Sequence, residues 1–141
     1  VLGLQKLYGI ATGVSLKGFP ALSSQVASAS GRAVPWQKSV VGAGAFTHEA
    51  GIHVDGLLKH PDNYQGFDPR EVGQAHRIVL GKHSGSRAVQ MVYAGLGLTV
   101  DDYEAQVLLS SVRHFVATHK HAPETADLRD LLTAIRSSLH A

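Results

Sequence analysis

The chain has 141 residues, 44% of them hydrophobic, which is enough to bury a core in one modest domain or two small subdomains. Its 13 Lys and Arg and 11 Asp and Glu residues are spread along the sequence and give a formal net charge of +2, so there is no reason to expect nucleic acid as a partner. The sequence has no cysteine, which excludes a disulfide framework, and it has no long apolar run or signal peptide, so we expect a cytoplasmic protein outside the membrane.

Two helices are predicted in the N-terminal part of the chain. The segment VLGLQKLYG is typical of the middle of an amphipathic helix. A second helix is expected from Ser15, whose side chain would cap it, to about Ser30, with Gly31 at its end. Residues 32–44 contain proline and glycine and are predicted to form a loop.

A third helix is predicted from Phe46 to Lys59, although Gly51 and Gly56 weaken it. Two glycines in one helix indicate that another part of the molecule approaches it closely. Residues 60–73 are rich in turn formers and are typical of a covering loop.

The remaining sequence predicts a short extended segment followed by a helical packing unit. Residues 77–80 are expected to be extended, and helices are expected over 84–96, 100–119 and 123–140. The predicted fold class is therefore mainly α.

The segment FTHEAGIHVDG, residues 46–56, has the composition of a functional site because it holds two histidines, two carboxylates and two glycines. On a helix, Glu49 and His53 would be four residues apart on one face, so the carboxylate could orient the imidazole and favour its charged form. His53 is therefore the best general-base candidate in the chain. The alternative is a histidine with a structural hydrogen bond, since the chain has nine histidines.

A metal site in the same segment is disfavoured by spacing. The zinc-protease helix has histidines four residues apart, whereas His48 and His53 are five apart and would diverge around a helix. His53 and His60 return to one face and have Asp62 nearby, but they form a weak ligand set, and a solvated face explains them as well. No metal ligands are therefore assigned to this chain.

Two further patterns have both a functional and a structural interpretation. The turn GKHSG, residues 81–85, could hold an anion on its backbone N–H groups with help from Lys82, or could be a helix cap. It lacks two residues of the nucleotide P-loop pattern. His119 and His121 form an HxH pair, which converges on one ligand in a strand but is expected to be solvated near a helix end.

Three blocks of the sequence resemble one protein family. VVGAGAFTHEAGIHVDGLLK, YQGFDPREVG and RIVLGKHSG occur in this order, and they are similar to the region after the barrel in isopropylmalate and homocitrate synthases. The flanking GRAVPWQKSVVGAG and the short helical tail resemble most closely the homocitrate synthases associated with nitrogenase.

The resemblance implies a Claisen-type condensation of acetyl-CoA with 2-oxoglutarate, which yields homocitrate and CoA. In the family, a TIM barrel supplies the divalent-metal ligands, and the metal polarises the ketone. That barrel is not found in this chain, so neither the metal nor another cofactor is expected to bind here. The predicted partners are the protein's own barrel and the barrel of a second subunit in a homodimer.

The resemblance also implies roles for individual residues. His53 matches the catalytic histidine that a lid delivers to the partner's barrel, with Glu49 orienting it and Tyr64 lining the same site. His48 is expected to be a supporting contact, and Ser84 is a substrate-binding candidate. Asp55 is a further candidate, although a turn or cap also explains Asp55 and Ser84.

The organisation that follows has three segments: a helical lead-in over 1–32, a lid-like subdomain over 33–83 and a three-helix subdomain over 84–141. These small helical subdomains would normally follow the barrel, and the chain alone is expected to be inactive. Alternatives are a sibling enzyme that uses another 2-oxo acid, such as 2-oxoisovalerate or pyruvate, a dimerisation module without catalytic residues, and a regulatory site for a small anion or a metal.

Overall fold

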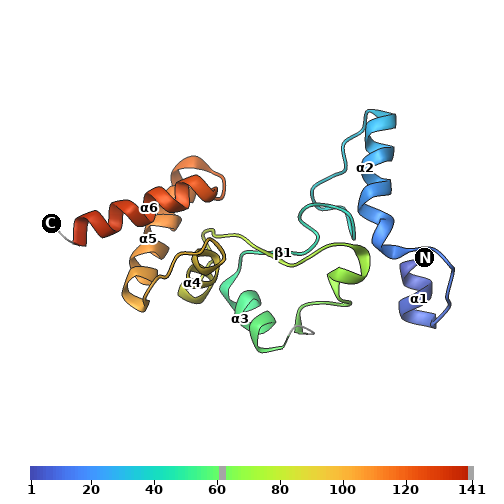
Figure 1. Cartoon of the computed structure of the whole chain (residues 1–141), viewed down its shortest axis with the longest axis horizontal. Helices are drawn as coiled ribbons and strands as arrows, with labels where there is room; N and C mark the ends of the chain where they lie inside the picture. Colours follow the sequence, from blue (N-terminus) through green and yellow to red (C-terminus); the bar gives the residue numbers. More distant parts are fainter. Residues whose placement is uncertain (61–62, 140–141) are drawn as a thin grey trace. The chain divides into compact units, whose positions relative to one another are not determined.

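The computed structural model describes residues 1–60 and 63–139, and helices dominate it (Figure 1). The mainly α fold class predicted from the sequence is confirmed. In chain order the elements are α1 (Leu2–Tyr8), η1 (Leu16–Gly18), α2 (Phe19–Ser30), β1 (Thr47–His48), α3 (Gly51–Lys59), η3 (Pro69–Val72), β2 (Arg77–Ile78), α4 (Ser86–Gly95), α5 (Asp102–His119) and α6 (Thr125–Leu139).

The chain forms two compact units, each made of two segments. The first unit contains Val1–Thr47 and Gln65–Arg77, and the second contains His48–Tyr64 and Ile78–Ala141. This division differs from the three predicted segments. Helix α3 belongs with the C-terminal helices because it packs against α4, so residues 48–56 of the FTHEAGIHVDG motif are part of the helical unit.

The two N-terminal helices lie close to their predicted positions. Gly9 and Gly31 follow α1 and α2 in the left-handed conformation, with φ of 66° and 67°, which glycine adopts without a steric penalty. The predicted role of Ser15 is wrong: it precedes the short helix η1, and its side chain makes no cap hydrogen bond. Helix α2 starts instead at Phe19, where Pro20 has the fixed φ that suits a first turn.

The first unit has a small core and leaves much apolar surface exposed. Its buried side chains include Leu16 of η1 and Val72 of η3. None of the residues of α1 and α2 is buried. Leu22 and Val26 of α2 are each 58% exposed.

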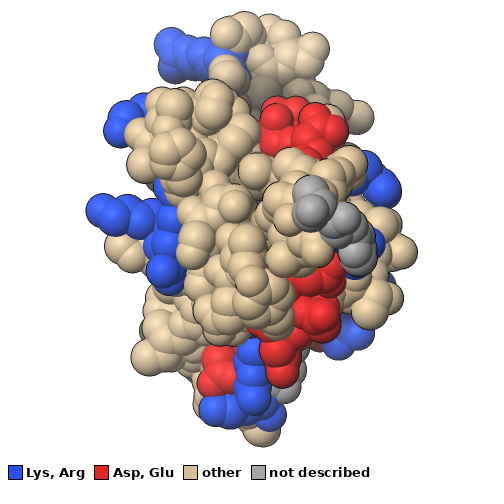
Figure 2. All heavy atoms as spheres, turned by 90° about the vertical axis from the view of Figure 1, so that its left-hand side faces the viewer, with Lys and Arg blue, Asp and Glu red and all other residues tan. Residues whose placement is uncertain are grey.

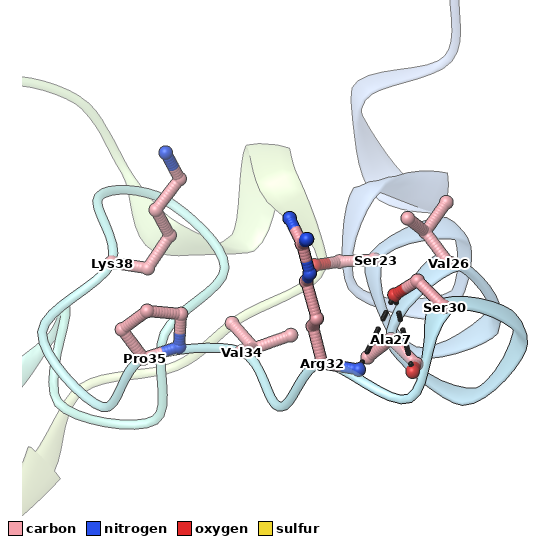
Figure 3. A pocket seen from close by; sticks show the side chains of 8 residues that line it. All are labelled: Ser23, Val26, Ala27, Ser30, Arg32, Val34, Pro35 and Lys38. Carbon is pink, nitrogen blue, oxygen red and sulfur yellow. Dashed lines mark hydrogen bonds between the residues drawn. The ribbon is translucent and has the colours of Figure 1, made fainter.

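A shallow hollow of about 340 Å³ lies between α2 and the loop after it (Figure 3). Val26, Val34 and Pro35 make it largely apolar. The Ser30 hydroxyl accepts from the Arg32 amide and donates to the Ala27 carbonyl, each at 3.4 Å, and so supports the turn at the end of α2.

The sequence predicted a helix from Phe46 to Lys59, but α3 begins only at Gly51. The residues before it form a short parallel strand pair: the Arg77 amide donates to the Phe46 carbonyl at 2.9 Å, and the Val79 amide donates to the His48 carbonyl at 3.0 Å. Pairing with a segment 31 residues further along the chain, as these bonds show, replaces the first helical turn.

The second unit contains the main hydrophobic core. Helices α4, α5 and α6 pack in sequence, as the helical periodicity predicted, and the fully buried side chains of Val89, Leu108 and Val112 lie in this core. Val54 of α3 is 1% exposed and belongs to the same cluster. Burying one such side chain contributes roughly 1.5–3 kcal/mol, so Val54 holds α3 firmly on the helical unit.

Local hydrogen bonds fix the ends and contacts of these helices. Asp101 and Glu104 form a reciprocal capping box at the start of α5. The buried Tyr93 hydroxyl donates to the Leu128 carbonyl at 2.7 Å and joins α4 to α6. Burial raises the pKa of Tyr93 to about 12, so the hydroxyl keeps its proton and this hydrogen bond throughout the physiological pH range.

Charged side chains on the face shown in Figure 2 form small separate groups of basic and acidic residues, and most of that surface is uncharged. Within residues 1–60 and 63–139, no helix is long and apolar enough to cross a membrane.

Candidate functional site

The N-terminus of α3 lies directly against the turn formed by residues 81–85. The Gly51 amide donates to the His83 carbonyl at 2.9 Å. A Cβ atom on Gly51 would lie 3.0 Å from the Gly85 nitrogen, so only glycine allows this approach without a shift of the backbone. The close approach that the two motif glycines predicted is therefore present at Gly51.

Glu49 binds the same turn and does not share a helix face with His53. Its Oε1 accepts from the His83 amide at 3.2 Å, and its carboxylate fills the space beside Gly81 that a Cβ atom would need. The predicted i, i+4 pairing is wrong because Glu49 precedes α3. Glu49 is instead an anion that the chain supplies to its own turn.

Ser84 is the buried centre of this arrangement, with 1% of its surface exposed. Its hydroxyl accepts from the Gly81 amide at 2.9 Å and donates to the Glu49 carbonyl at 3.1 Å. The Ser84 carbonyl accepts from Arg113 Nη2 of α5 at 3.1 Å. The side chain does not cap α4, whose N-cap is Gly85. Ser84 therefore acts on the geometry of the turn.

The backbone of the GKHSG turn is largely occupied by partners within the chain. The amides of Gly81, His83 and Ser84 donate to the Ser84 hydroxyl, the Glu49 carboxylate and the Gly81 carbonyl. An external anion would have to displace these acceptors. The predicted anion cradle of backbone N–H groups is therefore already filled at these three amides.

This bracing decides which way His53 faces. The next residue, Val54, is buried in the core of the second unit, and neighbouring residues on a helix point about 100° apart. His53 is consequently exposed, and the adjacent Ile52 is 72% exposed. An imidazole beside an uncovered isoleucine is accessible to a ligand or to another polypeptide surface.

Tyr64 packs against His53. Their ring centroids lie 4.5 Å apart with an interplanar angle of 38°. Tyr64 is 39% exposed, and Asn63 beside it donates to the Gly56 carbonyl at 3.4 Å. The structure thus brings together His53 and Tyr64, two residues that the sequence placed in one site.

Gly56 provides the space for the tyrosine ring, because a Cβ atom at this position would overlap Tyr64. We expect Gly56→Ala to displace the tyrosine ring from His53. In an enzyme that uses this pair, turnover should fall roughly tenfold, which corresponds to a rise of about 1.4 kcal/mol in the activation free energy. Stability should change little, since alanine favours the helix by about 0.5–1 kcal/mol and offsets part of the lost packing.

Gly95→Ala is the matched control, because Gly95 ends helix α4 of the same unit and a Cβ atom there meets nothing within 4 Å. Steady-state kinetics and urea unfolding of both variants provide the measurement. Equal turnover of the two variants would show that the position of Tyr64 does not matter.

Asp55 connects α3 to α4. Its carboxylate contacts Lys59 at 2.6 Å and Arg87 at 2.7 Å. The hydrogen bond from Lys59, reinforced by Arg87, lowers the pKa of Asp55, so the carboxylate remains charged at neutral pH. These contacts give Asp55 a positioning role for the helix that carries His53.

The other histidines of the sequence do not gather into a metal site in the described residues, where no group of three or more His, Asp or Glu side chains could hold an ion. His48 lies in β1, outside the helix that carries His53. Asp62, the third member of the weak set with His53 and His60, lies outside the described residues. His119 and His121 are exposed, and their rings contact Phe115.

Sequence reasoning missed the contributions of Arg87 and Arg113, which fix the motif and the turn from helices α4 and α5. These contacts join residues 32 and 29 positions apart. No local pattern marks such pairs, because they depend on how α4 and α5 pack against the motif and the turn.

The fold and the site together define a mainly helical domain that presents an exposed histidine from a braced helix. The family described as "Homocitrate synthase post-HMGL domain-like" matches residues 40–120. The chain belongs to this family, and the resemblance predicted from the three sequence blocks is confirmed.

Three relatives illustrate the similarity. Homocitrate synthase 1 of Nostoc sp. is 38% identical over 98% of the chain, 2-isopropylmalate synthase 2 of Caldanaerobacter subterraneus subsp. tengcongensis is 44% identical over 80%, and (R)-citramalate synthase CimA of Methanocaldococcus jannaschii is 36% identical over 96%. The chain spans 37%, 29% and 27% of the length of these relatives.

Proposed function

We propose that this region supplies a catalytic histidine to a 2-oxo-acid acyltransferase that condenses acetyl-CoA with 2-oxoglutarate to homocitrate and CoA. The observation that carries the proposal is the exposed His53, which lies on a braced helix beside Tyr64 within the segment that matches the family. A core histidine would be buried and bonded, whereas this one faces outward.

In this proposal His53 acts as the general base or assists one. Its neutral imidazole accepts a proton from the methyl group of acetyl-CoA, and the resulting enolate attacks the ketone carbon of the 2-oxo acid. Hydrolysis of the thioester then releases CoA. Tyr64 limits the motion of the imidazole through ring contact, and its hydroxyl can donate to or accept from the substrate.

Glu49, Ser84 and Asp55 are proposed to position the site. Glu49 and Ser84 fix the 81–85 turn against the start of α3, and Asp55 holds the middle of α3 to α4. Holding a reacting group in place removes an entropic part of the barrier, so residues that touch no substrate still influence the rate. His48, at the start of the motif, is proposed as a supporting contact.

The exposed apolar surface of the first unit supports contact with another folded domain. The large apolar side chains of α1 and α2 are more exposed than is usual for a surface that faces only solvent. They comprise Leu4 (44%), Leu7 (76%), Tyr8 (71%), Leu22 (58%) and Val26 (58%). We propose that a TIM barrel of the same protein covers them, and that His53 reaches the barrel of a second subunit in a cytoplasmic homodimer. The divalent metal of the reaction is proposed to bind in the barrel.

The acceptor 2-oxoglutarate is favoured by the homocitrate synthase of Nostoc, which matches 98% of the chain. We propose the nitrogenase-associated type because the segment GRAVPWQKSVVGAG resembles that type. The isopropylmalate and citramalate synthases among the relatives support 2-oxoisovalerate and pyruvate as the alternative acceptors. Initial rates of CoA release with the three acids, measured on the polypeptide that includes the barrel, distinguish these possibilities.

The chain of 141 residues alone is expected to show no condensation, with or without a divalent metal. One histidine and its supports provide an acid/base group, but no described cluster in this chain binds the metal that polarises the ketone. The measurement is thiol release from acetyl-CoA with each 2-oxo acid. Turnover by the chain alone would overturn the proposal of a catalytic appendage. A full-length polypeptide without turnover on any of the three acids would favour a dimerisation module.

A further inference from the structure

A second hollow, of about 620 Å³, lies on the second unit and is lined by basic residues. Lys82 of the GKHSG turn and Arg113 and Lys120 of α5 and its end line it, together with Val116 and Ala117. The described lining includes no acidic residue. Its residues are separate from His53 and Tyr64.

No described acidic side chain forms an ion pair with the basic residues of this hollow. Neither Lys82 nor Lys120 forms an ion pair with a described residue, and the one described partner of the Arg113 guanidinium is the uncharged Ser84 carbonyl. Three like charges around one hollow repel one another, and an anion that binds among them relieves this repulsion.

The hydrogen bond to Ser84 fixes one of the three cations. Because Ser84 is buried, the guanidinium of Arg113 is attached to a rigid part of the turn and offers its remaining N–H groups. The C-terminal end of α5 opposes an anion with about half a negative charge, but the three full positive charges outweigh it.

Lys120 has an unusual backbone conformation for a lysine. It follows α5 with φ of 62°, in the left-handed region where glycine is the usual residue. A side chain in this conformation carries a steric cost that glycine avoids. Replacement of Lys120 by glycine therefore removes the charge without harming the backbone.

We propose that this hollow binds the phosphate or diphosphate group of a small organic molecule. A phosphate group carries about two negative charges and several acceptor oxygens, which suits three convergent cations better than a single carboxylate does. Val116 and Ala117 offer apolar contact to the part of the ligand next to the phosphate. The site is independent of whether the protein catalyses the proposed condensation.

Titration calorimetry of the full chain with inorganic pyrophosphate at low ionic strength tests the proposal. Lys82→Ala and Lys120→Gly should each weaken binding by about tenfold or more, as expected for loss of a charge-assisted contact. The unfolding midpoint of Lys120→Gly should stay the same or rise. Lys17→Ala is the control, because this substitution removes the same charge from the first unit. It should leave pyrophosphate binding unchanged.

Competition identifies the source of the phosphate. Displacement of pyrophosphate by CoA supports a coenzyme ligand, and displacement by inorganic phosphate alone supports a free ion. Absence of pyrophosphate binding, equal binding by Lys17→Ala, Lys82→Ala and Lys120→Gly, or tighter binding of citrate than of pyrophosphate would overturn the proposal. Because the experiment measures binding without turnover, its failure is distinguishable from failure of the proposed catalytic function.

Discussion

His53→Ala should lower the turnover of the full-length enzyme by about 10²- to 10⁴-fold, which is the usual effect of removing a positioned acid/base group. His53 is exposed, and the adjacent core anchor is Val54, so the substitution removes the imidazole without removing a core contact. The free energy of unfolding and the affinity for the divalent metal should therefore remain nearly unchanged. A loss confined to the catalytic rate is the signature of a group that acts in the transition state.

His114→Ala is the matched control, because His114 is an exposed histidine on α5 of the same unit. Its turnover should equal that of the unmodified enzyme. Steady-state rates as a function of pH, together with metal titration, provide the measurement. An unchanged rate of His53→Ala would move the proposed role to another histidine, of which His48 is the first to examine.

Ser84→Ala should destabilise the second unit by about 2–6 kcal/mol, since it leaves two groups without their partner, each at a cost of about 1–3 kcal/mol. These groups are the Gly81 amide and the Glu49 carbonyl. The turn then keeps only the bonds of His83 to the Glu49 carboxylate and the Gly51 amide. We expect the rate to fall as well, because Glu49 and Gly51 set the direction of the helix that carries His53.

Ser110→Ala provides the comparison for Ser84→Ala. Ser110 is an exposed serine of α5, and its hydroxyl donates to the Gln106 carbonyl at 3.4 Å. This bond lies within one helix and exchanges readily with water, so its loss should change stability by less than about 0.5 kcal/mol. Urea unfolding of both variants gives the two free energies. If the two variants unfold at the same urea concentration, Ser84 does not brace the turn.

The proposed catalytic site and the basic hollow both depend on the 81–85 turn. Glu49 contacts the turn through the amide of His83 and the hydroxyl of Ser84, and the Gly51 amide at the start of α3 donates to the His83 carbonyl. Arg113, which lines the basic hollow, contacts the carbonyl of Ser84. A ligand in the hollow would therefore touch the support of the helix that presents His53.

The sequence contains a partial signal for the basic hollow. Arg113, Val116, Ala117 and Lys120 are spaced i, i+3, i+4 and i+7, the spacing of one helix face. The contribution of Lys82 from a separate turn was not visible, because it depends on the packing of α5 against that turn.

The sequence by itself determined the local features of this protein. Apolar periodicity predicted the three C-terminal helices, Gly31 marked the end of α2, and the motif composition selected His53 as a candidate, whereas Tyr64 was named only through the family resemblance. Each of these follows from neighbours within a few residues, where propensity, capping and side-chain spacing act directly.

Only the tertiary structure decided where the motif helix begins and what Glu49 does. A helix from Phe46 satisfies local propensity, but β1 pairs with β2, and the Glu49 carboxylate accepts from the His83 amide, 34 residues away. Backbone hydrogen bonds to a distant segment satisfy the same polar groups that a helical turn would have used. The choice between these two pairings depends on contacts that sequence spacing does not contain, and that choice sets the direction in which His53 faces.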